Sequence, residues 1–179
     1  MLELEVKAFF SDEASENFLS LNLPVIDELI QIDTYYQHPC VDFVATDEAL
    51  RIRLSGSEAK ITYKGPKLDK DTKMRAEHET TVDNPAEARM ILERLGFHEV
   101  GTVEKRRQRF QQGDLCIAID EVRNLGSFIE IEALTEDQIE SAKERIFSFL
   151  RGIGIARECT IRDSYLELLL KKASAHPSF

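Results

Sequence analysis

Apolar and charged residues alternate along several short segments of the chain. In residues 2–7, Leu2, Leu4 and Val6 alternate with the charged residues Glu3, Glu5 and Lys7. Because successive side chains of a β-strand point to opposite faces, this period of two predicts a strand with one apolar and one charged face. The same pattern predicts strands at residues 50–54, 61–64, 75–79 and 129–132, and less regular ones at 103–110 and 115–120.

Helical segments are predicted between and after these strands. Ser11, Asn84 and Thr135 are each followed by first-turn acidic residues or by proline, as expected of N-caps. Gly96 follows the second helical pattern and is a typical C-terminal stop. The patterns predict helices over about residues 11–23, 84–96 and 135–152, and a last helix that begins near residue 163.

These elements predict an α+β protein that is mainly antiparallel β. With 179 residues, of which 42% are apolar, the chain is long enough for one domain with a sizeable core. We therefore expect one domain over residues 1–172. Residues 173–179 have the small, polar and proline-containing composition of a loose tail.

The charge balance excludes some partners. The chain has 23 Lys and Arg against 33 Asp and Glu, a net charge of −10, so its overall field repels nucleic acid and anionic membranes. A polyanionic ligand would need cations gathered at one place. Cys40, Cys116 and Cys159 show no CxxC spacing, and no apolar run approaches the ~20 residues of a membrane span. We expect a cytoplasmic protein with reduced thiols.

The charged faces of the predicted strands carry same-sign pairs. Glu3 with Glu5, Glu77 with Glu79, and Glu130 with Glu132 each place two carboxylates on one face, ~7 Å apart by the strand rise. Such pairs suit a hard cation such as Mg²⁺ or Mn²⁺. Arg51 with Arg53, and Lys105 with Arg107, offer paired donors for phosphate oxygens. The alternative for any single strand is an ordinary solvated face of an antiparallel sheet.

Strands with one charged and one apolar face could close into a barrel whose charges point inward and whose exterior is covered by helices. The alternation alone fits a flat sheet with a charged outer face equally well. The residues by themselves leave this choice open.

The ordered set of motifs resembles the CYTH family, which includes class IV adenylyl cyclases, thiamine triphosphatases and inorganic triphosphatases. The resemblance covers residues 1 to about 170. It begins with Glu3-x-Glu5-x-Lys7 and continues through Asp33-Thr34-Tyr35-Tyr36, Leu50-Arg51-Ile52-Arg53, Thr62-Tyr63-Lys64-Gly65-Pro66, Arg75-x-Glu77-x-Glu79, Val103-x-Lys105-x-Arg107, Asp120-x-Val122 and Leu125-Gly126-x-Phe128-Ile129-Glu130-Ile131-Glu132.

The resemblance implies a closed eight-stranded antiparallel β-barrel, a tunnel with helices packed outside, that binds a triphosphate with Mg²⁺ or Mn²⁺, as two ions. It implies metal ligands, or their immediate support, at Glu3, Glu5, Asp120, Glu130 and Glu132. It implies triphosphate binding by Lys7, Arg51, Arg53, Lys64, Arg75, Lys105 and Arg107. Among these residues it implies catalytic roles for Lys7 and Arg53, and further ones for Glu77 and Glu79 as second-metal or water-positioning groups.

Two enzymatic functions fit this resemblance, and a third function is not enzymatic. The segment Tyr35-Tyr36-Gln37-His38-Pro39 resembles class IV adenylyl cyclases, which convert ATP to cyclic AMP and pyrophosphate. Hydrolysis of inorganic, thiamine or nucleoside triphosphates uses the same residues. A non-catalytic polyphosphate-binding module would have no use for paired acids. The resemblance also allows a homodimer, and the Lys67–Lys73 loop could reach the tunnel mouth.

Overall fold

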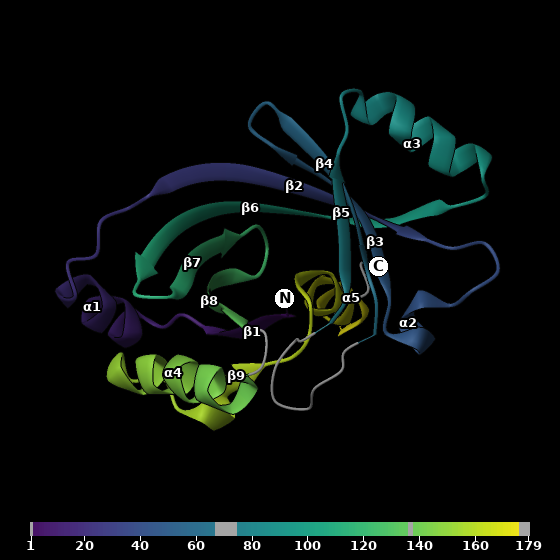
Figure 1. Cartoon of the computed structure of the whole chain (residues 1–179). Helices are drawn as coiled ribbons and strands as arrows, with labels where there is room; N and C mark the ends of the chain where they lie inside the picture. The colour runs from purple at the N-terminus through teal and green to yellow at the C-terminus, as the bar shows by residue number, and fades with distance from the viewer. Residues whose placement is uncertain (1, 67–74, 136–137, 176–179) are drawn as a thin grey trace.

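The computed structural model describes residues 2–66, 75–135 and 138–175, without the side chains of residues 2, 3 and 135. Its elements are β1 (Leu2–Phe9), α1 (Asp12–Ser20), β2 (Asp27–Gln37), α2 (Phe43–Thr46), β3 (Ala49–Ser55), β4 (Glu58–Lys64), β5 (Glu77–Thr81), α3 (Pro85–Arg94), β6 (His98–Gln112), β7 (Leu115–Val122), β8 (Gly126–Thr135), α4 (Ile139–Gly152), η1 (Arg157–Cys159), β9 (Thr160–Ile161) and α5 (Tyr165–Ala175) (Figure 1).

All strands belong to one antiparallel sheet in the order β5-β4-β3-β2-β6-β7-β8-β1-β9, which confirms the predicted mainly antiparallel α+β fold. The predicted closed barrel of eight strands differs from this arrangement. Among the described residues the sheet has nine strands, and no pairing joins its end strands β5 and β9. Each end strand is short, five residues in β5 and two in β9, so few backbone groups are available for closing bonds.

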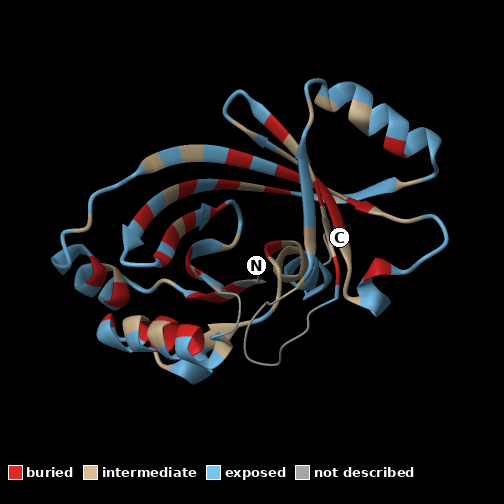
Figure 2. Cartoon of the chain, viewed as in Figure 1, coloured by how far each residue is buried: buried red, intermediate tan, exposed pale blue. Residues whose placement is uncertain are grey.

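The main core lies where α1 and α4 cover the apolar face of β1, β7 and β8 (Figure 2). Leu4, Val6 and Ala8 of β1 are buried there against Phe18 of α1 and Ile146 of α4. These three strand residues are the apolar phase of the predicted alternation. Their burial turns Glu5 and Lys7 toward the other face of the sheet.

A second core lies under α3. Tyr36, Leu50 and Ile52 of β2 and β3 pack there with Leu92 of the helix. The predicted cap at Asn84 is confirmed, because its side chain accepts a hydrogen bond from the Glu87 backbone N–H. Gly96 follows the helix with φ +92°, a conformation that suits glycine.

Helix α5 lies against the cavity face of the sheet, so the prediction that all helices pack outside was wrong for this element. Tyr165, Leu166, Glu167 and Leu170 line the central cavity, and α5 approaches β6 closely. A Cβ atom at Gly101 of β6 would lie 2.8 Å from Leu166 Cδ1. The helix extends to Ala175, and residues 176–179 lie outside the described residues.

Some element boundaries differ from the sequence-based predictions. Thr135 does not cap α4. It ends β8, where it pairs with Leu2, and Gln138 is the N-cap residue, although its side chain makes no capping hydrogen bond. The strand predicted at 75–79 begins only at Glu77. The long strand β2 was not predicted, since apolar residues such as Ile30 and Leu29 occupy both of its faces.

None of the described helices is both long enough and apolar enough to cross a membrane.

Candidate active site

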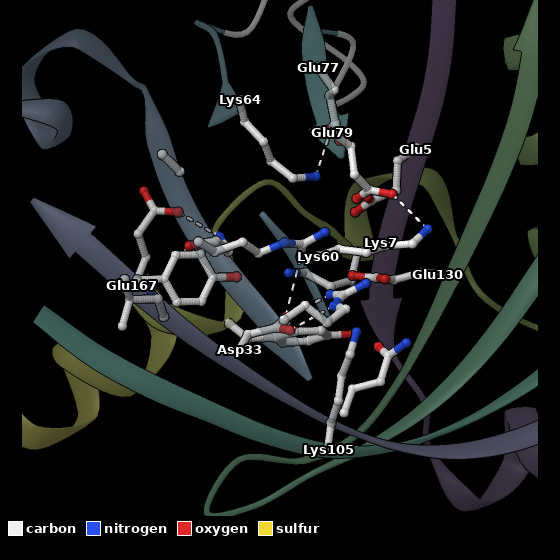
Figure 3. Close-up of a pocket in the computed structure, with 18 of the residues that line it drawn as sticks. Glu5, Lys7, Asp33, Lys60, Lys64, Glu77, Glu79, Lys105, Glu130 and Glu167 are labelled. Carbon is white, nitrogen blue, oxygen red and sulfur yellow. Dashed lines mark hydrogen bonds and ion pairs between the residues drawn. The ribbon is translucent and has the colours of Figure 1, made fainter. Parts of the chain in front are cut away.

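A cavity of about 540 Å³ lies on the charged face of the sheet and is lined by side chains of β1 to β6 and β8 and of α5. Figure 3 shows Lys7, Lys60, Lys64 and Lys105 reaching into the same space as Glu5, Glu77, Glu79 and Glu130. The alternating charged residues therefore meet around one cavity, and their faces are not simply exposed to solvent.

Three carboxylates form an acidic cluster at one wall. Oxygen atoms of Glu5, Glu130 and Glu132 all lie within 4.8 Å of one another. The strand register explains this proximity, because Glu5 of β1 is directly opposite Glu132 of β8 and Lys7 is opposite Glu130. Two same-face positions on each of two paired strands thus bring three acids and one lysine together.

Asp33 of β2 holds two arginines of the neighbouring strand β3. Arg53 donates from Nε to Oδ1 and from Nη2 to Oδ2, both at 2.6 Å, and Arg51 Nη1 donates to Oδ2 at 3.3 Å. Burial raises the pKa of Asp33, but the hydrogen bonds from Arg53 and the charges of Arg51, Arg53 and Lys105 together lower it from 3.8 to about 2. Asp33 is therefore an anion at neutral pH and orients both arginines.

Asp120 of β7 likewise accepts hydrogen bonds from two cations of β6. Arg107 donates from Nε and Nη2 at 2.7 and 2.6 Å, and Lys105 Nζ donates at 2.9 Å. Arg107 Nη2 also bonds Glu130 and so joins this group to the acidic cluster. Burial, followed by the charge of Arg107, lowers the pKa of Lys105 to about 8, although Glu130 and Asp120 oppose the shift.

Tyr165 of α5 lies over the lysines. Its ring centroid is 4.0 Å from Lys7 Nζ and 5.0 Å from Lys105 Nζ, and its hydroxyl donates to Asp120 Oδ2 at 2.8 Å. Burial, with the charges of Glu130 and Asp120, raises the pKa of the Tyr165 hydroxyl well above its usual value. The hydroxyl therefore stays protonated as a donor.

Another part of the cavity lining consists of ion pairs between β4 and β5. Lys64 Nζ donates to Glu77 Oε1 at 2.6 Å, and Glu79 accepts from Lys60 Nζ at 2.8 Å and from Thr62 Oγ1 at 2.9 Å. Register again accounts for the contacts, since Lys64 is directly opposite Glu77. The predicted acids of β5 are thus neutralised by lysines of the neighbouring strand.

Most of the residues predicted for the site line the cavity. They are Glu5, Lys7, Arg51, Arg53, Lys64, Arg75, Glu77, Glu79, Lys105, Arg107, Glu130 and Glu132. Arg75 Nη2 lies 3.8 Å from Asp47 Oδ1. Asp120 is not in the acidic cluster, because its oxygens accept bonds from Lys105, Arg107 and Tyr165. The side chain of Glu3 and residues 67–74, which include the whole Lys67–Lys73 loop, lie outside the described residues.

Sequence reasoning gave no site role to Asp33, Tyr165 and Lys60. Asp33 appeared only within a motif, and the direct pairing of Asp33 with Arg53 would have required the register of β2 on β3. Tyr165 falls within the last predicted helix, which begins near residue 163. Lys60 is in phase with Thr62 and Lys64, but it precedes the predicted strand 61–64 by one residue, whereas β4 begins at Glu58.

The acidic cluster fits a hard divalent cation. Three carboxylates converge from paired strands, and oxygen ligands of this charge are those that Mg²⁺ and Mn²⁺ prefer. Glu5, Glu130 and Glu132 are the residues that would hold such an ion. The cations around Asp33 and Asp120 lie in the same cavity.

Comparisons with known proteins agree with this arrangement. The CYTH domain model matches residues 1–165. A candidate adenylate cyclase from Methanocaldococcus jannaschii is 37% identical over 172 residues, which are 94% of this chain and 98% of the relative. The PH1819 protein from Pyrococcus horikoshii has a TM-score of 0.86 and 41% identity, with coverage of 95% of this chain and 99% of that one.

A candidate adenylyl cyclase from Hippeastrum, whose structure is described as revealing a dominant triphosphatase activity, shares the fold. Its TM-score is 0.69 at 17% identity, with coverage of 96% of this chain and 95% of that one. The family model and the Methanocaldococcus relative both span nearly the whole chain, and the cavity is lined by nearly all of the charged residues of the family's motifs found in the sequence. The chain therefore belongs to the CYTH family.

Proposed function

We propose that this protein is a metal-dependent adenylyl cyclase that converts ATP to cyclic AMP and pyrophosphate. The observation that carries the proposal is the meeting, in one cavity of about 540 Å³, of a three-carboxylate cluster with cations from β1, β3, β4 and β6. An anion binder needs the cations alone. Acids next to them suit a substrate that arrives as a metal complex, and the Methanocaldococcus relative bears the cyclase name.

The cations bind the triphosphate in this proposal. Arg51, Arg53, Lys64, Arg75, Lys105 and Arg107 donate to phosphate oxygens, and Lys7 lies beside Glu130 where phosphate and acidic cluster meet. Asp33 and Asp120 fix the arginine planes before the substrate arrives. Donors that are already oriented need little reorganisation as charge develops on the phosphates.

The reaction transfers no group to the protein. The ribose 3′-hydroxyl attacks the α-phosphorus of ATP and releases its proton to solvent. A new P–O bond forms while the bond between the α-phosphorus and the oxygen that bridges to the β-phosphorus breaks, which releases pyrophosphate. Lys7 and Arg53 stabilise the charge that gathers on the leaving oxygens, and Glu77 and Glu79 position the attacking group. Mg²⁺ or Mn²⁺, as two ions, would neutralise phosphate charge and lower the pKa of the attacking oxygen.

Hydrolysis of a triphosphate is the second candidate. The same donors and acids serve when water attacks the terminal phosphorus, and hydrolysis makes no demand on a base-binding surface. The Hippeastrum protein of the same fold is described with a dominant triphosphatase activity. Inorganic, thiamine and nucleoside triphosphates are the substrates to compare.

Product analysis tests these functions. The purified chain is incubated with ATP, and separately with inorganic triphosphate, in Mg²⁺ or Mn²⁺, and the products are separated by chromatography. Cyclic AMP with pyrophosphate supports the cyclase. ADP, or pyrophosphate with free phosphate, supports the hydrolase, and binding without product leaves a polyphosphate-binding module. Turnover by Glu130→Ala equal to that of the unaltered chain would contradict the metal assignment.

A further inference from the structure

Helix α5 contributes one side chain that contacts charged groups from three strands. Tyr165 is nearly fully buried, donates to Asp120 of β7, and presents its ring to Lys7 of β1 and Lys105 of β6. No other described tyrosine contacts two lysines in this way. We propose that Tyr165 is a positioning residue, which holds the lysines and Arg107 in the arrangement that binds the triphosphate.

The hydroxyl acts through Asp120. That carboxylate is 0% exposed and accepts bonds from Lys105, from two nitrogens of Arg107 and from Tyr165. The tyrosine bond comes from the helix side, whereas the others come from β6. Because an anion held from two sides cannot rotate, Asp120 keeps the guanidinium plane of Arg107 fixed toward the cavity.

The ring acts on Lys7 directly. Lys7 is 1% exposed, so its ammonium has lost most of its hydration. An aromatic face 4.0 Å away offsets part of that cost, and the effect is largest where water is excluded. The ring therefore helps to keep a charged ammonium in the cavity before any phosphate arrives.

The local structure fixes Tyr165 in this place. Ser164 and Glu167 form a reciprocal capping box: the Ser164 N–H donates to Glu167 Oε2 at 2.5 Å, and the Glu167 N–H donates to Ser164 Oγ at 3.2 Å. Tyr165 is the first residue of the helix, and its ring packs against Phe128 of β8 with centroids 5.0 Å apart. The cap and the packing therefore fix the position of the Tyr165 ring before a ligand binds.

This inference rests on the proposed function, because it names what positions the cations of that site. The test uses the full chain with Tyr165→Phe, which removes the hydroxyl and keeps the ring, and Tyr165→Leu, which removes both. Tyr36→Phe is the matched control, since Tyr36 is equally buried but lies in the core under α3. The probe is inorganic triphosphate without divalent metal, so that binding is measured by calorimetry in the absence of turnover.

We expect Tyr165→Phe to bind triphosphate about tenfold more weakly than the unaltered chain, and Tyr165→Leu about tenfold more weakly again. Tyr36→Phe should bind as the unaltered chain does. In turnover assays the loss in Tyr165→Phe should appear mainly in KM, because the contacts exist before the reaction begins. Since Tyr165→Phe keeps the packing of the ring, it remains informative even where Tyr165→Leu does not fold.

The results distinguish failure of the positioning role of Tyr165 from failure of the proposed function. Triphosphate binding by Tyr165→Phe as tight as by the unaltered chain overturns the positioning role and leaves the proposed function intact. An equal loss in Tyr36→Phe also overturns it, since the effect would then be general. An unaltered chain that binds no triphosphate, either without divalent metal or with Mg²⁺ present, contradicts the proposed function, and this inference falls with it.

Discussion

Asp33 and Arg53 form a two-bond ion pair across β2 and β3, with Nε to Oδ1 and Nη2 to Oδ2 both at 2.6 Å. Asp33 is 1% exposed and is directly opposite Arg53 in the register of the two strands. The fork contact fixes the guanidinium plane, and it leaves Nη1 of Arg53 outside both bonds. One buried aspartate thus sets the direction in which a cavity arginine presents its remaining donors.

Removal of the Asp33 charge should destabilise the fold. Asp33→Asn leaves Arg51 and Arg53 largely buried without their anion, and loss of one partner of a buried pair costs about 3 kcal/mol. Urea denaturation at neutral pH measures the free energy of unfolding. Asp27→Asn, on the same strand but in a much more exposed pair with Arg109, should cost under about 1 kcal/mol. Equal losses in the two variants would contradict the assignment.

Low pH should remove the contribution of the ionised Asp33 carboxylate to the free energy of unfolding. The pKa of Asp33 is about 2 in the folded chain against 3.8 as its usual value, so its contribution is complete above about pH 4 and is lost as the pH falls toward 2. At about 1.4 kcal/mol per pH unit, the contribution is about 2 kcal/mol. Unfolding free energies measured from about pH 5 downward should fall more steeply for the unaltered chain than for Asp33→Asn. Parallel curves would refute the shift.

Metal affinity should depend on the acidic cluster. Glu132→Gln keeps the shape of the side chain and removes one of three converging charges, so Mn²⁺ binding measured by calorimetry should weaken at least about tenfold. Glu121→Gln is the control, because Glu121 lies on the exposed face of β7 and pairs with Arg106. Mn²⁺ bound equally well by Glu132→Gln would place the metal elsewhere.

Triphosphate affinity should depend on the planar shape of the Arg53 guanidinium as well as on its charge. Arg53→Lys keeps one positive charge but loses the planar fork, so affinity for inorganic triphosphate should fall about tenfold. Arg106→Lys makes the same change in a fork contact with Glu28 on the exposed face of β6 and should leave affinity unaltered. If both variants bind as the unaltered chain does, Arg53 has no part in holding phosphate.

Triphosphate binding should weaken at alkaline pH through Lys105. With its pKa lowered to about 8, Lys105 is charged below that pH and loses its proton above it, so its attraction for phosphate is present below about pH 8 and declines beyond. Calorimetric titrations of the unaltered chain and of Lys105→Met should differ at about pH 7 and converge as the pH rises. If the triphosphate affinities of the unaltered chain and of Lys105→Met differ by the same factor at every pH, the lowered pKa of Lys105 is contradicted.

The charged faces of the strands were predictable because their apolar neighbours are so regular. Leu4, Val6 and Ala8 are buried, which leaves no choice for the direction of Glu5 and Lys7. That these residues then meet Glu130 and Glu132 depends on the register of β1 on β8, which the local pattern does not contain. The family resemblance supplied the grouping that periodicity could not.

Other parts of the site could not be read from local patterns. On β2, Leu29 shares the cavity face with Asp33, and the apolar Ile30 and Ile32 lie exposed on the other face, so the usual alternation is absent. Tyr165 lies in a segment with Leu168 and Leu169, and helical spacing there indicates a packed residue. Its hydroxyl bond to Asp120 spans 45 positions, a contact that no local signal reveals.

The site joins residues from opposite ends of the chain, since Lys7 belongs to the first strand and Tyr165 to the last helix. During synthesis β1 leaves the ribosome long before α5, and its pairing with β8 must also wait for distant residues. We therefore expect a nascent chain to carry Glu5 and Lys7 without the groups that orient them. Cellular nucleotides would meet a competent binding cavity only once nearly the whole chain has been translated.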